Sequence, residues 1–191
     1  MRILTLAGSP RKKGNTNTLL SAFEALAAQR HSVERIHIPD YSIHGCLGCD
    51  ACQNNLEIPG CVQKDDARGI FEQMLAADAI VYASPVYVWD FTAQLKTLMD
   101  RQYALVKWNA ENQKISLLAG KHTLLLVTCG GPVETNADLV QQIFDRQMDY
   151  AGCCVVGHYA AGQCTTPREL GDRTQQIARQ MLEDLEQKTT C

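Results

Sequence analysis

The 191-residue chain has no excess of positive charge that would suit a polyanionic partner. It has 18 Lys and Arg residues against 21 Asp and Glu residues, a formal net charge of −3 at pH 7. Electrostatics therefore gives no reason to expect nucleic acid or an anionic membrane as a partner. Long hydrophobic runs are lacking too: none approaches a membrane span, and the apolar N-terminal stretch is shorter than a secretory h-region. We expect a cytoplasmic protein.

Several familiar catalytic motifs are also missing. The chain has no Walker ending Gly-Lys-Ser/Thr and no GxGxxG fingerprint, which argues against a nucleoside triphosphatase and a Rossmann dinucleotide site. It has neither the GxSxG elbow of hydrolases nor an HExxH zinc motif. We assign no catalytic side chain. With no internal repeat, low-complexity tract or linker, we expect one domain over residues 1–191, interrupted by a cysteine-rich insertion loop at about 39–64.

What the chain does contain is an alternation of short apolar runs and amphipathic stripes. The β-rich runs are Ile3 to Ala7, Val33 to Ile38, Ala79 to Ala83, Thr123 to Thr128 and Cys153 to His158. The third and fourth are continuously apolar, as expected of parallel strands covered on both faces. Helical stripes lie between and after them, at residues 19–27, 70–75, 140–148 and 177–185. This alternation predicts an α/β fold with a five-stranded parallel sheet and right-handed crossovers.

The first loop has the features of a phosphate site. Directly after the first run the sequence is Gly8-Ser-Pro-Arg-Lys-Lys-Gly-Asn-Thr-Asn-Thr18, and a helix follows. Small and hydroxyl residues at a helix N-terminus present free backbone N–H groups and the positive end of the helix dipole. Because the loop follows the first strand of a parallel sheet, it lies at the edge where ligands bind.

Nine cysteines is a high count, and four of them fall in the segment from Pro39 to Lys64. Thiols are kept reduced in the cytosol and an odd number cannot all pair, so we expect a metal or redox site rather than a disulfide framework. Cys46, Cys49 and Cys52 have CxxCxxC spacing, and Cys61 follows after eight intervening residues. Three hypotheses remain: a 4Fe–4S cluster, a loop of redox-labile thiols, or zinc. The nearby His44 is an alternative ligand.

Four motifs, in order, resemble a known family. GSPRKKGNT, CLGCDAC with GCVQKDD, SPVY and QLKTLMDR together look like the NAD(P)H-dependent FMN reductases and their relatives, the iron-sulfur flavoproteins, across roughly the first two-thirds of the chain. The gap before Cys61 is longer here than in the flavoproteins. The resemblance implies a three-layer, doubly wound, flavodoxin-like fold with strand order 2-1-3-4-5 and FMN at the point where the order reverses.

The resemblance also implies a set of cofactor contacts. Around the FMN phosphate it places Ser9, Arg11, Gly14, Asn15, Thr16 and Asn17. Against the flavin ring it places Pro85, Val86 and Tyr87, while Trp89 either joins them or packs against protein. A third flavin loop would contain Thr128, Gly130 and Gly131, where paired glycines allow close approach to the backbone. Cys46, Cys49, Cys52 and Cys61 would be the cluster ligands.

The function implied is an FMN-dependent oxidoreductase. It would take a hydride from NADH or NADPH and pass electrons to a quinone, free flavin, small electrophile or protein, with a 4Fe–4S cluster as a one-electron wire. The alternatives are a non-enzymatic electron carrier reduced by ferredoxin and a metal-binding module with a vacant flavin site. We expect a homodimer or homotetramer with the 39–64 loop near a neighbour's flavin. Lys96 and Asp100, one helical turn apart, predict a surface ion pair. The resemblance implies that these two residues and Arg101 help to brace a subunit contact.

Overall fold

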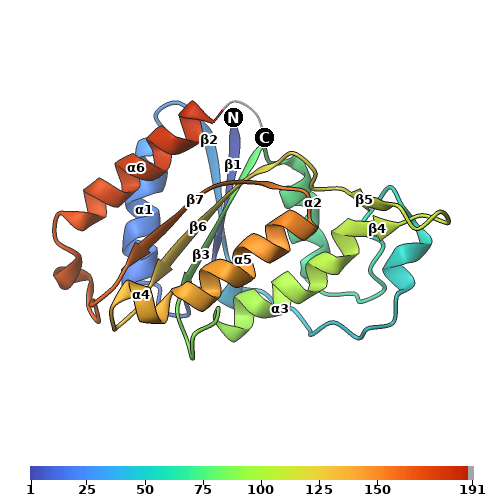
Figure 1. The fold of residues 1–191 in the computed structure, drawn as a ribbon, viewed down its shortest axis with the longest axis horizontal. Coiled ribbons are helices and arrows are strands. Elements are labelled where there is room, and N and C mark those ends of the chain that lie inside the picture. The colour runs from blue at the N-terminus through green and yellow to red at the C-terminus, as the bar shows by residue number, and fades with distance from the viewer. Residues whose placement is uncertain (189–191) are drawn as a thin grey trace.

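The protein is built on one parallel β-sheet. The structure, a computed structural model, describes residues 1–188, so Cys191 and the last residues of the predicted domain lie outside the described part. Five strands pair in the order β2-β1-β3-β6-β7, all parallel (Figure 1). Their bounds are Arg2–Ala7 for β1, Ser32–His37 for β2, Ala79–Pro85 for β3, His122–Thr128 for β6 and Cys154–Ala161 for β7. The prediction of a five-stranded parallel sheet is confirmed.

The predicted order 2-1-3-4-5 is not confirmed, because the chain contains two strands that the sequence analysis did not foresee. Val106–Trp108 (β4) and Lys114–Ser116 (β5) form a separate antiparallel hairpin between β3 and β6. Strands of three residues carry no readable alternation, so nothing in their pattern indicated them. The strand ends also differ slightly from those predicted, and β7 runs to Ala161 rather than His158.

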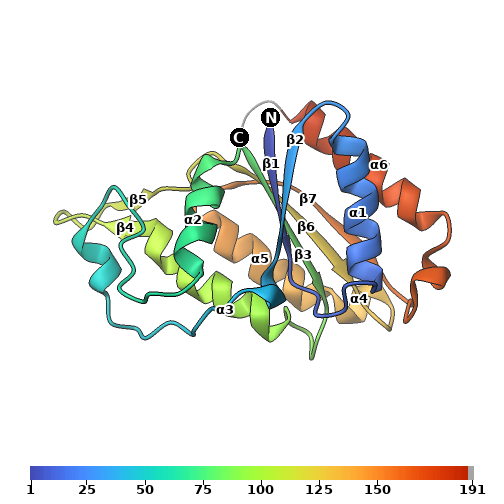
Figure 2. The same cartoon turned by 180° about the vertical axis from the view of Figure 1, so that it is seen from behind.

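Helices cover both faces of the sheet because the strand side chains are apolar on both faces and have to be buried. Helices α1 and α6 lie on one face, and α2, α3 and α5 lie on the other (Figure 1, Figure 2). Their bounds are Asn15–Ala27 for α1, Ala67–Ala76 for α2, Ala93–Arg101 for α3, Asp138–Tyr150 for α5 and Arg173–Gln187 for α6. On β3, Ile80 and Tyr82 face one core, whereas Val81 faces the other.

The apolar stripes predicted from the sequence form the buried faces of these helices. Leu19, Leu20 and Phe23 of α1 pack in one core, and Val140 and Phe144 of α5 pack in the other. Each apolar face removes its area from water, which is the main driving force for helix docking. A short α4, Val133–Asn136, precedes α5. No helix among residues 1–188 is both long and apolar enough to cross a bilayer.

The cysteine-rich segment forms a lobe beside the sheet together with the β4–β5 hairpin. Between β2 and α2 the chain has only short 3-10 helices, at Ile38–Asp40 and Ala51–Asn54. The Gln53 side chain bridges the lobe to β4: its Nε2 donates to Val106 O at 3.0 Å and its Oε1 accepts from Trp108 N at 3.2 Å. The hairpin thus supports the cysteine segment, as Figure 2 shows at the end of the molecule remote from α6.

Candidate functional site

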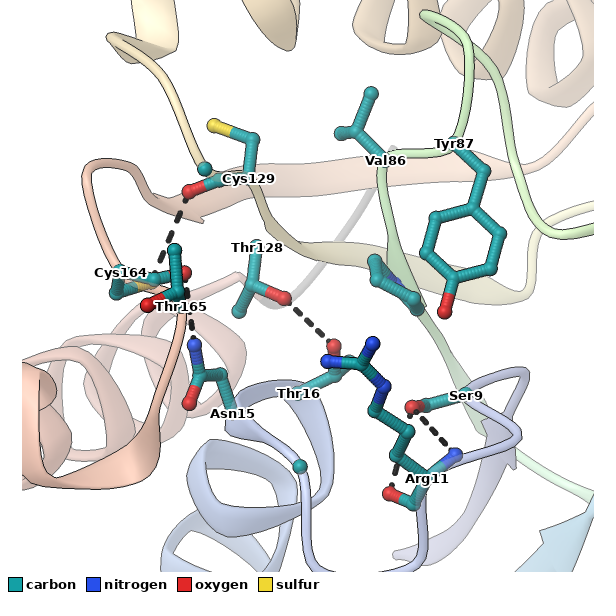
Figure 3. A pocket seen from close by; sticks show the side chains of 13 residues that line it. Ser9, Arg11, Asn15, Thr16, Val86, Tyr87, Thr128, Cys129, Cys164 and Thr165 are labelled. Carbon is teal, nitrogen blue, oxygen red and sulfur yellow. Dashed lines mark hydrogen bonds between the residues drawn. The ribbon is translucent and has the colours of Figure 1, made fainter.

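A pocket of about 200 Å³ opens at the carboxyl edge of the sheet. It lies among the loops after β1, β3, β6 and β7, across the point between β1 and β3 where the strand order reverses (Figure 3). In doubly wound sheets this is where ligands bind. Its lining consists of Ser9, Arg11, Gly14, Asn15, Thr16, Pro85, Val86, Tyr87, Thr128, Cys129, Gly130, Cys164 and Thr165.

The first loop ends in an uncapped helix N-terminus that faces this pocket. Gly14 is the N-cap of α1 and makes no side-chain cap hydrogen bond, so the first amides of the helix remain available. The loop is closed by Gly14 N donating to Arg11 O at 2.9 Å and by Asn17 Nδ2 donating to Arg11 O at 3.0 Å. A Cβ on Gly14 would lie 3.0 Å from Arg11 Cβ, so the close turn favours glycine. The result is a concave donor surface with a positive dipole end.

Two long-range hydrogen bonds fix the position of this loop. The buried hydroxyls of Thr16 and Thr128 lie 2.7 Å apart, and Asn15 Nδ2 donates to Cys164 O at 2.9 Å. The Oδ1 atoms of Asn15 and Asn17 are buried and have no partner among the described residues. Unpaired buried acceptors are costly, which marks Asn15 Oδ1, in the pocket lining, as a group to be satisfied by a ligand's donor.

Arg11 supplies the positive side chain of the pocket. It is exposed, it forms no ion pair within residues 1–188, and its guanidinium extends over the pocket beside Thr16 (Figure 3). The flanking Lys12 is engaged elsewhere, with its Nζ 2.8 Å from Asp40 Oδ2. An arginine free of a carboxylate partner suits a phosphate, to which its guanidinium can donate two parallel hydrogen bonds.

The loop after β3 forms an apolar wall. Val86 N donates to Thr128 O at 2.8 Å, and Tyr87 and Asp90 exchange backbone hydrogen bonds across a tight turn. The two central residues of this turn, Val88 and Trp89, have φ values of 51° and 61°. Left-handed backbone is uncommon for any non-glycine residue and strained for β-branched valine, so the surrounding hydrogen bonds must enforce it. Tyr87 is thereby presented at the pocket.

Three predicted contacts lie outside the lining. Trp89 turns toward α4, where its Nε1 donates to Thr135 O at 3.1 Å. Asn17 is buried beneath the first loop. Gly131 closes the turn after β6, since its carbonyl accepts from Gln163 N at 2.9 Å. Asn17 and Gly131 therefore support the pocket rather than line it.

Three lining residues were not anticipated: Cys129, Cys164 and Thr165. Burial raises the pKa of the Cys129 and Cys164 thiols, so both thiols are uncharged at pH 7. Cys164 and Thr165 follow the last strand, and only the pairing of β7 with β6 brings that loop to the pocket. In the sequence, the run Cys164-Thr165-Thr166 after an apolar strand is the feature that could have indicated this part of the pocket.

The four clustered cysteines line a second, smaller cavity of about 60 Å³. Cys46 and Cys49 are exposed, whereas Cys52 and Cys61 are partly buried. Burial raises the pKa of Cys52. Among residues 1–188 no group of three or more His, Cys, Asp or Glu side chains lies close enough together to bind one metal ion. His44 does not line the cavity; its Nδ1 lies 3.3 Å from Asp65 Oδ2.

A buried ion pair anchors this segment to α3. The side chains of Arg101 and Asp65 are 1% and 2% exposed, with 2.7 Å between Nη1 and Oδ2. Arg101 also donates to His44 O at 2.8 Å and to Cys61 Sγ at 3.2 Å. Burial alone would raise the pKa of Asp65, but its hydrogen bonds with Arg101 and backbone amides outweigh burial and lower the pKa to about 2. Arg101 is thus an internal anchor, and the Lys96–Asp100 ion pair beside it is present as predicted.

A second buried cation, Lys107, contacts the backbone of the cysteine segment. It is 0% exposed and donates to Cys52 O at 2.6 Å and to Pro59 O at 2.9 Å. Burial lowers the pKa of Lys107, while ionised thiols of Cys52 and Cys61 act in the opposite direction. No property of Lys107 in the sequence distinguished it from a surface lysine.

Comparison with known proteins agrees with this arrangement. A family model described as NADPH-dependent FMN reductase matches residues 1–166. An iron-sulfur flavoprotein of Archaeoglobus fulgidus is 32% identical over 182 residues, which are 95% of this chain and 77% of that protein. The chain matches the next relatives, also iron-sulfur flavoproteins, over only about half of their length, 48% to 56%.

Solved structures share the fold at low sequence identity. The NAD(P)H:quinone oxidoreductase of Methanothermobacter marburgensis has a TM-score of 0.72 at 19% identity, with 95% of this chain and 96% of that chain covered. An FMN-dependent NADH-azoreductase of Bacillus anthracis, in complex with FMN, has a TM-score of 0.67 at 14% identity, with 97% and 99% covered. These structures show the shared fold, while the family match over residues 1–166 and the flavoprotein of Archaeoglobus fulgidus show that the chain belongs to the NADPH-dependent FMN reductase family; the predicted class, an FMN-dependent oxidoreductase, is confirmed.

Proposed function

We propose that the pocket at the carboxyl edge of the sheet holds FMN. We propose further that the chain passes electrons from NAD(P)H to a quinone, a free flavin, a small electrophile or a protein. The observation that carries this assignment is the uncapped N-terminus of α1, which opens into a pocket containing an unpaired Arg11. A single phosphate ester fits these donors, and the buried Oδ1 of Asn15, a lining residue, suits a hydroxyl of its polyol chain.

Different residues of the pocket would hold the phosphate and the flavin ring of FMN. Ser9, Arg11, Gly14, Asn15 and Thr16 would surround the phosphate, with Asn17 supporting their loop. At the other end of the pocket, the loop after β3 would cover the flavin ring with Pro85, Val86 and Tyr87. The third loop would approach it with Thr128 and Gly130, backed by Gly131, Cys129, Cys164 and Thr165. Trp89 would stabilise the turn rather than contact the ring.

Bound FMN supplies the redox chemistry, which is hydride acceptance from a nicotinamide and onward donation of electrons. The protein's part is orientation and access. Tyr87 is 42% exposed and Val88 is 88% exposed, so the ring end of the pocket is open to a small donor or acceptor. The phosphate end, by contrast, is enclosed by buried Ser9 and Thr16.

We propose that the cysteine cavity holds a 4Fe–4S cluster. Each thiolate of such a cluster binds a different iron, so the sulfurs need to surround a common space rather than converge on one ion. Cys46, Cys49, Cys52 and Cys61 line a common cavity but are not arranged around one ion. This donor set suits a cluster better than zinc, which draws four ligands to one centre. The two buried cations beside it suit a negatively charged group.

The rival function is a non-enzymatic electron carrier, reduced by ferredoxin. It is favoured by the cysteine cavity and by the similarity of the chain to iron-sulfur flavoproteins. Steady-state oxidation of NADPH, and separately of NADH, by purified protein with excess FMN distinguishes the two. We expect nucleotide oxidation that depends on protein concentration. Fully FMN-loaded protein that oxidises neither nucleotide would contradict the reductase and favour the carrier.

We also propose that the chain acts as a homodimer or homotetramer. Tyr87, Val88 and Trp89 form an exposed apolar patch beside the pocket, and such patches mark contact surfaces. The 39–64 segment would lie near a neighbour's flavin. The single domain over residues 1–191 and the cytoplasmic location expected from the sequence stay predictions.

A further inference from the structure

The segment between Cys52 and Cys61 is folded back on itself by one side chain. Lys107 Nζ donates to Cys52 O at 2.6 Å and to Pro59 O at 2.9 Å, so a single ammonium group bonds both ends of the segment. Gly60 follows with a φ of 66°, and its position would bring a Cβ to 3.3 Å from Cys52 O. The long gap between the third and fourth cysteines is thereby closed, and Cys52 and Cys61 line the same cavity.

Lys107 and Arg101 differ in whether an acidic side chain neutralises their charge. Arg101 is paired with the carboxylate of Asp65. Lys107 is fully buried, its two partners are neutral carbonyls, and no ion pair within residues 1–188 includes it. A buried charge without a counter-charge is costly. The cost is offset if an anionic group occupies the neighbouring cavity.

We propose that Lys107 is a positioning residue of the cysteine site: its ammonium fixes the two ends of the 52–61 segment, and its buried charge stabilises the anionic, thiolate-bound cluster. This inference rests on the proposed cluster. Positive charge close to a metal centre also favours addition of an electron, because the reduced centre is the more negative form. Lys107 therefore raises the reduction potential as well as retaining iron.

The chain offers a matched control for this inference. Lys121 is a second, partly buried lysine whose Nζ donates to two backbone carbonyls, Leu75 O at 2.8 Å and Ala77 O at 2.6 Å. It caps the end of α2, and neither of its two acceptors belongs to the cysteine segment, which holds both acceptors of Lys107. Lys121→Met removes the same kind of group as Lys107→Met, and therefore separates a general loss of stability from an effect on the cysteine site.

The test uses the full chain, reconstituted anaerobically with iron, sulfide and FMN. It compares wild type, Lys107→Met, Lys107→Arg and Lys121→Met. The readouts are iron and sulfide content, the rate of iron release to a chelator, the midpoint potential of the iron signal and FMN content. For Lys107→Met we expect iron release at least tenfold faster, or loss of most of the iron, with FMN retained. In the protein that keeps iron, we expect one-electron reduction at least tenfold less favourable, about 59 mV.

Lys107→Arg keeps the charge and the donors, so its iron release and potential should lie close to those of wild type, and Lys121→Met should match wild type. Equal behaviour of Lys107→Met and Lys121→Met would overturn the inference while leaving the cluster in place. Arginine as defective as methionine would overturn the role of the charge. Wild type that takes up no iron would overturn both the cluster and the inference.

Discussion

The hydroxyls of Thr16 and Thr128 lie 2.7 Å apart, and this buried contact joins the N-terminus of α1 to the end of β6 across 112 residues of sequence. The preceding residue, Asn15, joins the same loop to the segment after β7 through its hydrogen bond to Cys164 O. Protein hydrogen bonds thus hold the loops of the pocket to one another, which lowers the cost of ordering them on binding.

Replacing Asn15 and Thr16 together by alanine tests the phosphate site. We expect FMN binding to weaken by about 1–3 kcal/mol, because ligand hydrogen bonds and both loop contacts are lost. Titration calorimetry measures the change. Thr18→Ala is the control: Thr18 bonds Gly14 O on the same helix but does not line the pocket, so its FMN affinity should stay near that of wild type. Unchanged affinity in the double variant would sink the assignment.

Replacing Asp65 by asparagine tests the buried anchor of the cysteine segment. We expect the free energy of unfolding at pH 7 to fall by about 3 kcal/mol, because Arg101 is left buried without its counter-charge. Denaturant unfolding measures it. Asp100→Asn removes the exposed partner of Lys96 and should cost less than about 0.5 kcal/mol. Equal losses in the two variants would contradict a special role for the buried pair.

The same pair predicts a pH dependence of stability. The pKa of Asp65 is about 2 in the folded state, below the value of about 3.9 for an unfolded aspartate. A lowered carboxyl pKa stabilises the fold above the unfolded value, and the contribution disappears as pH falls toward the folded value. Between about pH 4 and pH 2 the wild type should therefore lose ~2 kcal/mol that Asp65→Asn does not lose. Parallel stability curves for both proteins would count against this.

Replacing Cys49 by serine tests the cluster. We expect anaerobically reconstituted wild type to contain about four irons and four sulfides per chain. The variant should lose most of both and keep its FMN, because the phosphate loop is remote from the cysteine cavity. Cys153→Ser is the control, since Cys153 lines neither cavity. Wild type that takes up no iron on reconstitution would contradict the cluster and favour a cluster-free flavin reductase.

The strained turn at Val88 predicts a stabilising substitution. Asparagine tolerates left-handed backbone far better than valine, so in the single chain, measured below the concentration at which it assembles, Val88→Asn should raise the free energy of unfolding by about 1 kcal/mol. Val62→Asn, at another exposed valine without positive φ, should change stability by less than about 0.5 kcal/mol. Thermal unfolding compares them. A destabilised Val88→Asn protein would mean that the valine side chain has a partner.

Light scattering of the wild type at micromolar concentration tests the proposed assembly. We expect a mass that is two or four times that of one chain, because the apolar patch at Tyr87, Val88 and Trp89 is exposed in a single chain. Val88→Glu, which puts a charge at the most exposed of these positions, should shift the mass toward that of one chain. A wild type found only as a single chain would contradict the proposal.

The sequence alone determined the layers of the fold and the place of the phosphate loop, because both depend on local pattern. Continuously apolar runs such as Ala79 to Ala83 have to be covered on both faces, and stripes such as Leu19, Leu20 and Phe23 make one buried helix face. Glycine and hydroxyl residues before a helix present donors whatever lies beyond them.

Only the tertiary structure decided which distant residues complete each site. Arg101 and Lys107 are ordinary basic residues in the sequence, and they become buried cations only because α3 and β4 pack against the cysteine segment. Cys164 and Thr165 line the pocket only because β7 pairs beside β6. The physical reason is the same in each case: burial and electrostatic interaction depend on distance in space, which local sequence pattern does not encode across tens of residues.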